Sequence, residues 1–406
     1  MHVLFVEPGF PSNQANFVRA LADVGARVTG IGEAPLEALP SSVRNCLHAY
    51  EQVATVVHEG ALLEAVQRCQ QREWVDRLEA TIEAHIFPTA RVREQCGIPG
   101  TSTKTAFLCR DKPAMKEALR AAGVPCAQST GATSGDEVRK FAAEVGFPLI
   151  IKPPDAAGAA GVERVDDAAA LDGAIDRSHV DRGVTVAVEE FVEGHEGFYD
   201  TISIGGEIHH EFISHYYPNV LEAMRSRWIS PQIIATNRLD AEAYGEVRQM
   251  AQNVNRALGI GTSPTHMEWF YGPKGLRFSE IGCRPPGVGA WDLYCAAHEI
   301  DVYREWANAI VHGQIAARST RGFAAGMISL RPDRDGRIAG VEGIHTIRQK
   351  YGDCIIDEHF PPTGSPTQPV EGGYWANAWM RLRHPDYDTL RSILDDVGRT
   401  VQVRAS

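Results

Sequence analysis

Hydrophobic and polar positions along the first quarter of the chain predict strands and helices in turn. Apolar runs and helical spacings give strand, helix, strand, helix and strand at 2–6, 13–24, 27–31, 61–70 and 80–86. Strands that alternate with helices are typical of an open parallel sheet. We therefore expect a Rossmann-like sheet in this part of the chain, although no GxGxxG dinucleotide fingerprint follows the first strand.

The middle of the chain begins with two helices that carry their own start signals. Asp111 and Ser134 are good N-cap residues for helices at 111–122 and 134–145, and Pro113 suits a first helical turn. Further strands are predicted at 148–152, 184–192, 207–214 and 233–236, and helices at 241–258 and 300–312. Two strands at 266–270 and 276–281, joined by a Gly- and Pro-containing turn, predict a hairpin.

The last eighty or so residues consist mainly of short β segments divided by Gly and Pro. They lie at 323–330, 338–341, 354–356 and 374–382, with a final helix at 386–397. The whole pattern predicts a multi-domain α/β protein (α+β overall) whose domains cover 1–105, 106–322 and 323–406, with a subdomain at about 126–190.

Composition narrows the class of partner. The 406 residues carry a net charge of −12, which argues against nucleic acid or an anionic membrane as the main partner. The N-terminus lacks a basic region, and no apolar stretch approaches the ~20 residues of a membrane span. The eight cysteines form no CxxC pair, so we expect reduced thiols and a cytoplasmic protein.

The stretch IIKPPDAAGAAGV suggests a phosphate site. Lys152 ends an apolar run, and a loop of small residues that includes Gly158 and Gly161 follows it. Small side chains let backbone N–H groups approach anionic oxygens, and the lysine adds a cation. In a P-loop the lysine follows the glycines, so this is not a P-loop.

The predicted hairpin carries two carboxylates that can share one face of the sheet. Glu268 lies within THMEWF, Glu280 ends the partner strand, and Arg284 follows in a loop with two prolines. Two adjacent carboxylates repel each other unless a cation lies between them, and hard oxygen ligands suit Mg²⁺. Two solvated carboxylates and a surface arginine explain the hairpin alone about equally well.

A third stretch, VEEFVEGHE, is an apolar strand that ends in acidic residues. Exposed backbone at a strand end can bind an adenine edge, and a later carboxylate can accept hydrogen bonds from ribose hydroxyls. Acidic strand ends are common, so this pattern alone does not identify a nucleotide site.

Each of these features is common by itself, but their order along the chain is specific. The stretches RDKPAMKEAL, IIKPPDAAGAAGV, VEEFVEGHE, THMEWF and FSEIGCRPPG follow one another between about residues 100 and 290. In that order they resemble the ATP-grasp superfamily, and most closely its carboxylate–amine, L-amino acid ligase-like branch. The resemblance implies an N-terminal Rossmann-like domain, a central ATP-grasp domain with a lid, and a small C-terminal β-rich domain.

The resemblance also implies a role for each site residue. Lys112 and Lys152 would neutralise the ATP phosphates, and the Gly158–Gly161 loop would close over them. Arg284 and Lys152 would act on the transferring phosphoryl group. The remaining implied contacts are adenine at Glu189, Glu190 and Val192, ribose at Glu196, and Mg²⁺ (or Mn²⁺) at Glu268 and Glu280. Gly282 stands where the family often has an asparagine, which leaves open whether one or two ions bind.

The implied reaction is ADP-forming ligation of a carboxylic acid, expected to be an amino acid, to an amine through an acyl phosphate. Its partners would be small molecules, and a homodimer is compatible with such folds. Two alternatives stay open: bicarbonate or formate activation on a nucleotide precursor, and a non-catalytic ATP-binding module.

Residues outside the five stretches give weaker signals. His266, Arg225 and Arg227 are candidate substrate contacts, and for His266 a structural role is equally compatible. His209 and His210 point to opposite faces of a strand, so we expect no chelation. No His-and-acid arrangement supports Cys283 as a nucleophile.

Overall fold

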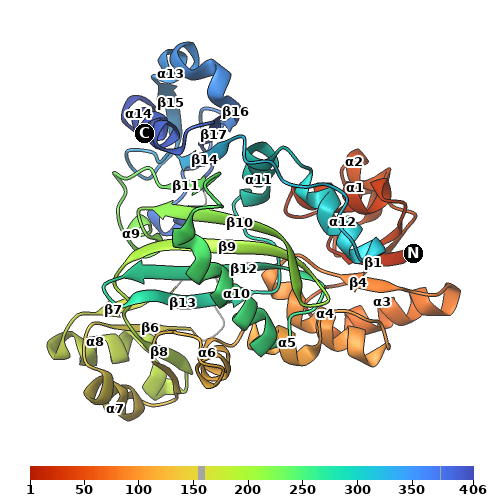
Figure 1. Cartoon of the computed structure of the whole chain (residues 1–406), viewed down its shortest axis with the longest axis horizontal. Coiled ribbons are helices and arrows are strands. Elements are labelled where there is room, and N and C mark those ends of the chain that lie inside the picture. Colours follow the sequence, from red (N-terminus) through yellow and green to blue (C-terminus); the bar gives the residue numbers. More distant parts are fainter. Residues whose placement is uncertain (154–160, 375) are drawn as a thin grey trace.

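The computed structural model describes residues 1–153, 161–374 and 376–406. Its N-terminal part is a parallel sheet in the order β3-β2-β1-β4. Figure 1 shows this part of the chain in red and orange, with β1 and β4 labelled. The strands are β1 (His2–Val6), β2 (Arg27–Gly32), β3 (Ala49–Gln52) and β4 (Arg77–Glu79). The helices are α1 (Gln14–Asp23), α2 (Ser41–Arg44), α3 (Glu59–Arg72) and α4 (Glu83–Gln95), with a 3₁₀ turn at Leu36–Ala38. The predicted open parallel sheet is confirmed.

One predicted strand in this part is wrong. The stretch 80–86 is not a strand, because β4 ends at Glu79 and α4 begins at Glu83. The buried face of α4 includes His85, Thr89 and Val92, which follow helical spacing. Most of these buried residues come after residue 86, so they lie outside the short apolar run that suggested a strand.

A second sheet of four antiparallel strands forms the lid, in the order β5-β8-β6-β7. The chain reaches it through α5 (Thr103–Leu108) and α6 (Lys112–Ala121). The lid contains β5 (Ser129–Ala132), α7 (Gly135–Val145), β6 (Leu149–Lys152), β7 (Glu163–Val165), α8 (Ala168–Ser178), a 3₁₀ turn (Val180–Arg182) and β8 (Val186–Glu190). Its buried residues, such as Val138, Leu149 and Val188, form a hydrophobic cluster of their own, so the lid is an independently packed unit.

The largest sheet has eight antiparallel strands, in the order β13-β12-β9-β10-β11-β14-β17-β16. Its first part consists of β9 (His195–Ile204), β10 (Glu207–Tyr217), β11 (Gln232–Ala235), β12 (Ser263–Gly272) and β13 (Gly275–Gly282). The associated helices are α9 (Val220–Ala223), α10 (Gly245–Leu258), α11 (Ala290–His298) and α12 (Val302–His312), with a 3₁₀ turn at Glu242–Tyr244. The predicted hairpin is confirmed as β12–β13.

The C-terminal strands continue this sheet. They are β14 (Ala324–Ser329), β16 (Ile355–His359) and β17 (Trp379–His384). A separate pair joins β15 (Ile338–Glu342) to β18 (Gln402–Ala405). The helices are α13 (Ile344–Tyr351) and α14 (Tyr387–Thr400), with 3₁₀ turns at Gly352–Cys354 and Val370–Gly372. The domain boundary at 322 remains a prediction.

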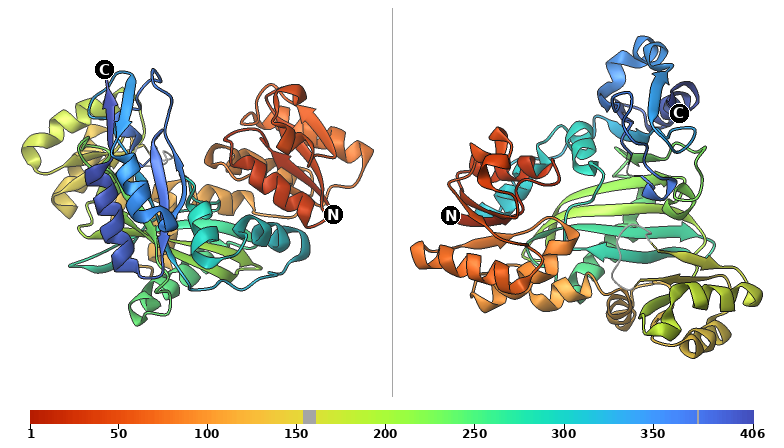
Figure 2. Two further views of the ribbon diagram at one scale, coloured as in Figure 1. Left: turned by 90° about the horizontal axis from the view of Figure 1, so that it is seen from above. Right: turned by 180° about the vertical axis from the view of Figure 1, so that it is seen from behind.

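One core ties the N-terminal sheet to the central sheet. Phe5 of β1 and Phe17 of α1 pack against Trp306 of α12, with ring centroids 6.2 and 5.2 Å from that of Trp306. The same hydrophobic cluster reaches Phe198 and Phe212 on the central sheet. Figure 2 shows the red N-terminal part and the cyan α12 side by side in both views. No helix within the described residues is long and apolar enough to cross a membrane.

Candidate active site

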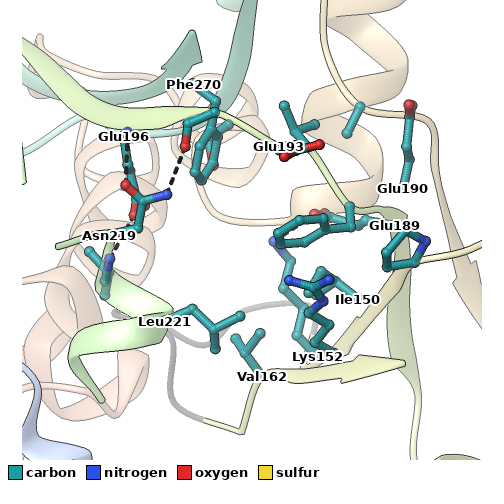
Figure 3. A pocket seen from close by; sticks show the side chains of 18 of the residues that line it. Ile150, Lys152, Val162, Glu189, Glu190, Glu193, Glu196, Asn219, Leu221 and Phe270 are labelled. Carbon is teal, nitrogen blue, oxygen red and sulfur yellow. Dashed lines mark hydrogen bonds and ion pairs between the residues drawn. The ribbon is translucent and has the colours of Figure 1, made fainter. Parts of the chain in front are cut away.

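A cavity of about 860 Å³ lies between the lid and the central sheet. That volume lies in the ordinary range for small-molecule sites. Figure 3 shows Lys152 and Glu189 on one side of it and Glu196 and Asn219 on the other. Of the residues predicted from the sequence, the cavity is lined by Lys112, Lys152, Glu189, Glu190, Val192, Glu196, Arg225, Glu268 and Glu280.

Helix α6 brings two lysines to the cavity. The Asp111 side chain caps the helix by accepting a hydrogen bond from the Ala114 N–H at 2.9 Å. Lys112 and Lys116 lie four residues apart and so on one helix face. Lys112 Nζ lies 3.3 Å from Glu280 Oε2, and both lysines are buried.

The Glu189 carboxylate joins the helix to the lid. Its Oε2 lies 2.7 Å from Lys116 Nζ and 2.7 Å from Lys152 Nζ. Burial alone would raise the pKa of Glu189, but the two lysines outweigh it and lower the pKa to about 2. Burial lowers the pKa of Lys116 to about 8 against the attraction of Glu189.

The other oxygen of Glu189 is free for a ligand. Glu189 Oε1 is buried, and no hydrogen-bond partner is found for it within the described residues. A buried unpaired acceptor costs about 1–3 kcal/mol unless a ligand or water satisfies it. A hydrogen-bond donor that reached this oxygen would satisfy it.

Three further carboxylates line the cavity, and one of them, Glu280, adjoins the lysines through Lys112. Glu268 of β12 and Glu280 of β13 are directly opposed residues in the hairpin ladder. Glu196 of β9 is buried, and its Oε2 accepts a hydrogen bond from the Val220 N–H at 2.7 Å. Burial and then the charges of Glu268 and Glu280 raise the pKa of Glu196 to about 8.

This donor arrangement fits Mg²⁺ bound together with a phosphorylated ligand. In the described part of the chain, no three or more His, Cys, Asp or Glu side chains are placed to hold a metal by themselves. Mg²⁺ usually takes only one or two carboxylates and completes its octahedral shell with water and phosphate oxygens. Glu268 and Glu280 supply such a pair, and their charges add to the larger effect of burial in raising the pKa of Glu196.

The structure places His266 behind Glu268 rather than at the cavity wall. His266 Nδ1 lies 2.7 Å from Asp200 Oδ1, and its Nε2 lies 3.5 Å from Glu268 Oε1. Burial would lower the pKa of His266, but Asp200 and Glu268 raise it to about 9. Tyr216 also donates a hydrogen bond to Glu268 Oε1, at 3.2 Å.

Arg284 lies next to the hairpin and reaches the N-terminal part of the chain. Its Nε donates to Glu83 Oε2 at 2.6 Å, and its Nη1 donates to the Pro285 carbonyl at 2.9 Å. A Cβ at Gly282 would lie 3.2 Å from Arg284 Cγ and 3.3 Å from Glu83 Oε2. The absence of a side chain at Gly282 therefore leaves room for this ion pair.

The remaining candidates lie around the rim or away from the cavity. Glu190 forms an ion pair with Lys274, and Arg225 lines the cavity. Arg227 instead contacts Asp335 at 2.6 Å, and Gly161 is an exposed turn residue. Gly158 lies outside the described residues.

The two neighbouring histidines lie in different environments. His210 is buried beside Glu305, with Nε2 and Oε2 3.3 Å apart, whereas His209 is exposed. That this pair does not chelate a metal stays a prediction. Cys283 is a buried member of the core that packs between the sheet and α10.

Sequence reasoning missed several residues of the site. The spacing of Lys116 four residues after Lys112 is a usable signal for one of them. The others are brought in by the tertiary fold and carry no local pattern: Glu83, Asp200, Tyr216 and Asn219.

Comparison with known proteins identifies the domain that carries this site. Residues 117–299 match the ATP-grasp domain family. Over its full length the chain superposes on the crystal structure of L-amino acid ligase from Bacillus licheniformis with a TM-score of 0.78, at 18% identity, covering 98% of that chain. The chain therefore has the ATP-grasp fold and contains an ATP-grasp domain, as the five ordered stretches predicted.

Curated relatives are similar over part of their length. The chain is 28% identical to the uncharacterised protein y4rH of Sinorhizobium fredii over 267 residues, covering 64% of this chain and 54% of that protein. It is 27% identical to alanine–anticapsin ligase of Bacillus subtilis over 235 residues, covering 52% of this chain and 48% of the ligase. The matched part thus spans about half the length of these relatives.

Proposed function

We propose that the protein is an ADP-forming ligase that joins a carboxylic acid, namely an amino acid, to an amine. The observation that carries the proposal is the division of one cavity into a lysine-lined side and a carboxylate-lined side. The first side suits the phosphates and base of ATP, and the second suits Mg²⁺. The similarity to alanine–anticapsin ligase and to an L-amino acid ligase supports an amino acid as the acid substrate.

In this reaction the acid attacks the γ-phosphorus of ATP and displaces ADP, which gives an acyl phosphate. The amine then attacks the carbonyl carbon and releases inorganic phosphate. Lys112 and Lys152 would neutralise phosphate charge as it shifts towards ADP, and the cation held by Glu268 and Glu280 would supply further charge neutralisation. Arg284 does not line the cavity and is paired with Glu83, so its proposed role of steadying the acyl phosphate requires it to leave that pair. A closed lid would limit hydrolysis of the acyl phosphate.

The roles at the nucleotide follow from the cavity walls. Glu189 Oε1 is proposed to accept from the adenine amino group, with backbone groups near Glu190 and Val192 beside the base. Glu196 is proposed to bind the ribose. Arg225 is proposed to contact the substrate carboxylate, since it lines the cavity, whereas Arg227 and His266 do not.

The test is release of ADP and phosphate from MgATP across a matrix of single and paired amino acids, with amide products followed by mass. We expect release to require one carboxylate and one amine, and Glu280→Gln to abolish it. Glu207→Gln, at an exposed position of the same sheet, is the matched control. Formation of AMP and pyrophosphate would contradict the acyl phosphate route.

A further inference from the structure

A chain of buried polar side chains runs behind the proposed metal ligand Glu268. Asp200 on β9 and His266 on β12 are directly opposed residues of neighbouring strands. The His266 Nδ1–H donates to Asp200 Oδ1 at 2.7 Å, and Nε2 faces Glu268 Oε1 at 3.5 Å. Of these three residues, only Glu268 lines the cavity.

Each member of the chain is fixed from another side. Asp200 is fully buried, and its second oxygen, Oδ2, accepts from the Tyr294 hydroxyl at 2.5 Å. The His266 ring packs edge-on against Phe198 with centroids 5.0 Å apart. These contacts leave the imidazole one orientation, in which Nε2 faces the Glu268 carboxylate.

The two oxygens of Glu268 are not equivalent. Within the described residues, the Tyr216 hydroxyl donates a hydrogen bond to Glu268 Oε1, and His266 Nε2 forms an ion pair with the same oxygen. Oε2 makes neither of these contacts and is the oxygen that we assign to a ligand in the cavity. Mutation of side chains that orient a ligating carboxylate typically weakens metal binding by about 10–100-fold.

We infer that Asp200 and His266 are positioning residues, which hold Glu268 Oε1 so that Oε2 is presented to the cation that accompanies the nucleotide. The inference rests on the proposed function for the existence of that cation. It assigns to Asp200 and His266 no contact with substrate, because neither lies at the cavity wall.

A second buried histidine–carboxylate pair, between strand β10 and helix α12, provides the control. His210 and Glu305 lie 3.3 Å apart and are as deeply buried, but neither lines the cavity. His210→Asn therefore removes a histidine–carboxylate contact of the same kind without touching Glu268. Any loss common to His210→Asn and His266→Asn reflects the fold rather than the site.

The experiment measures Mn²⁺ affinity in the presence of an ATP analogue with a CH₂ group between the β- and γ-phosphates. Protein is kept in excess over the analogue, and free Mn²⁺ is followed by electron paramagnetic resonance. We expect Asp200→Asn and His266→Asn to weaken Mn²⁺ binding by about 10–100-fold. His210→Asn should leave the Mn²⁺ affinity within about twofold, because His210 does not contact Glu268 and distant sites usually act independently.

A conservative variant separates the loss of the hydrogen-bond donor to Glu268 from the loss of side-chain volume. Glutamine at position 266 can still donate to Glu268 from near the Nε2 position, whereas asparagine reaches only towards Asp200. His266→Gln should therefore bind Mn²⁺ better than His266→Asn, and thermal unfolding checks that all variants are folded. Folded Asp200→Asn and His266→Asn proteins with wild-type affinity would overturn the inference, as would a glutamine variant no better than asparagine.

Failure of the two proposals can be told apart. If the wild-type protein and its nucleotide complex bind no Mn²⁺, both the inference and the metal part of the proposed function fail. If Mn²⁺ binding responds to the variants as expected but no acid and amine are joined, only the substrate part of the proposed function fails.

Discussion

Glu189 and Glu196 are two buried carboxylates seven residues apart that face the same cavity, yet their pKa values move in opposite directions. Glu189 lies between Lys116 and Lys152, and its pKa falls to about 2. Glu196 lies near Glu268 and Glu280, and its pKa rises to about 8.

Burial is nearly the same for the two side chains, so the charge of the neighbours decides the difference. On the lysine-lined side two cations, Lys116 and Lys152, share the one carboxylate of Glu189, so that side keeps positive charge for an anionic ligand. On the carboxylate-lined side the charges of Glu268 and Glu280 add to burial in raising the pKa of Glu196, so that side gains from a cation. The two sides therefore respond differently to substitution and to pH.

The largest expected effect follows from removing the carboxylate that the two lysines share. Glu189→Gln leaves Lys116 and Lys152 buried beside each other without their common partner. Breaking a buried ion pair from one side costs about 3–5 kcal/mol of unfolding free energy. Urea unfolding at neutral pH measures the loss.

A second substitution tests the cause of that loss. Adding Lys116→Met to Glu189→Gln removes one of the two stranded cations, and the double variant should regain at least about 1 kcal/mol. A double variant no more stable than Glu189→Gln would show that lysine repulsion is not the cause.

The next effect concerns activity rather than stability. Lys152→Met keeps the length of the side chain but removes the cation proposed to face the phosphates. Loss of one such charge lowers turnover by on the order of 10²–10³-fold, measured as ADP release. Lys140→Met, at an exposed position of α7, is the control and should retain wild-type turnover.

Local patterns predicted much of the site because several of its residues lie at the ends of regular elements. Lys152 ends β6 and Glu280 lies near the end of β13, so strand spacing located both. The prediction that Glu268 and Glu280 share one face of the sheet followed from the hairpin alone. Such contacts are short in sequence, and their geometry depends on one turn.

Contacts between distant elements were beyond the reach of these patterns. Glu83 meets Arg284 across 201 residues, and its segment was expected to be a strand. Strand β9, which carries Asp200, was not predicted at all, because its core positions are mixed with Asp, Thr and Ser. The polar side chains of β9 are buried only because the neighbouring strand β12 supplies hydrogen-bond partners for them.

The pH dependence of stability should separate Glu196 from Glu189. Because the folded-state pKa of Glu196 is raised from 4.5 to about 8, its stabilising contribution is fully present below pH 4.5 and is lost as pH rises to about 8. Glu196→Gln cannot ionise, so its stability relative to wild type should increase across this interval. Urea unfolding at several pH values in the absence of nucleotide and metal measures the difference.

Glu189→Gln provides the contrast for that experiment. With a pKa near 2, Glu189 is ionised throughout the same interval in the wild-type protein and adds no pH dependence of its own above pH 4.5. In Glu189→Gln, Lys116 loses the attraction that opposes the lowering of its pKa, so a slope in that variant reports the lysine rather than the carboxylate. A level difference for Glu196→Gln would contradict the assignment of opposite environments to the two carboxylates.

The smallest effect is expected where the same kind of ion pair meets solvent. Glu190, next to Glu189 in the chain, pairs with Lys274, whose side chain is 60% exposed. Exposed pairs contribute about 0–1 kcal/mol and weaken as salt screens them, so Lys274→Ala should cost less than about 1 kcal/mol of unfolding free energy and less still at high salt. Lys116→Met leaves Glu189 buried without one of its two lysine partners, so it should cost more unfolding free energy. This cost should depend little on salt, because dissolved ions do not reach the buried Lys116–Glu189 pair. Equal salt dependence in the two variants would mean that solvent reaches the Lys116–Glu189 pair, and the contrast between the buried and exposed pairs would then fail.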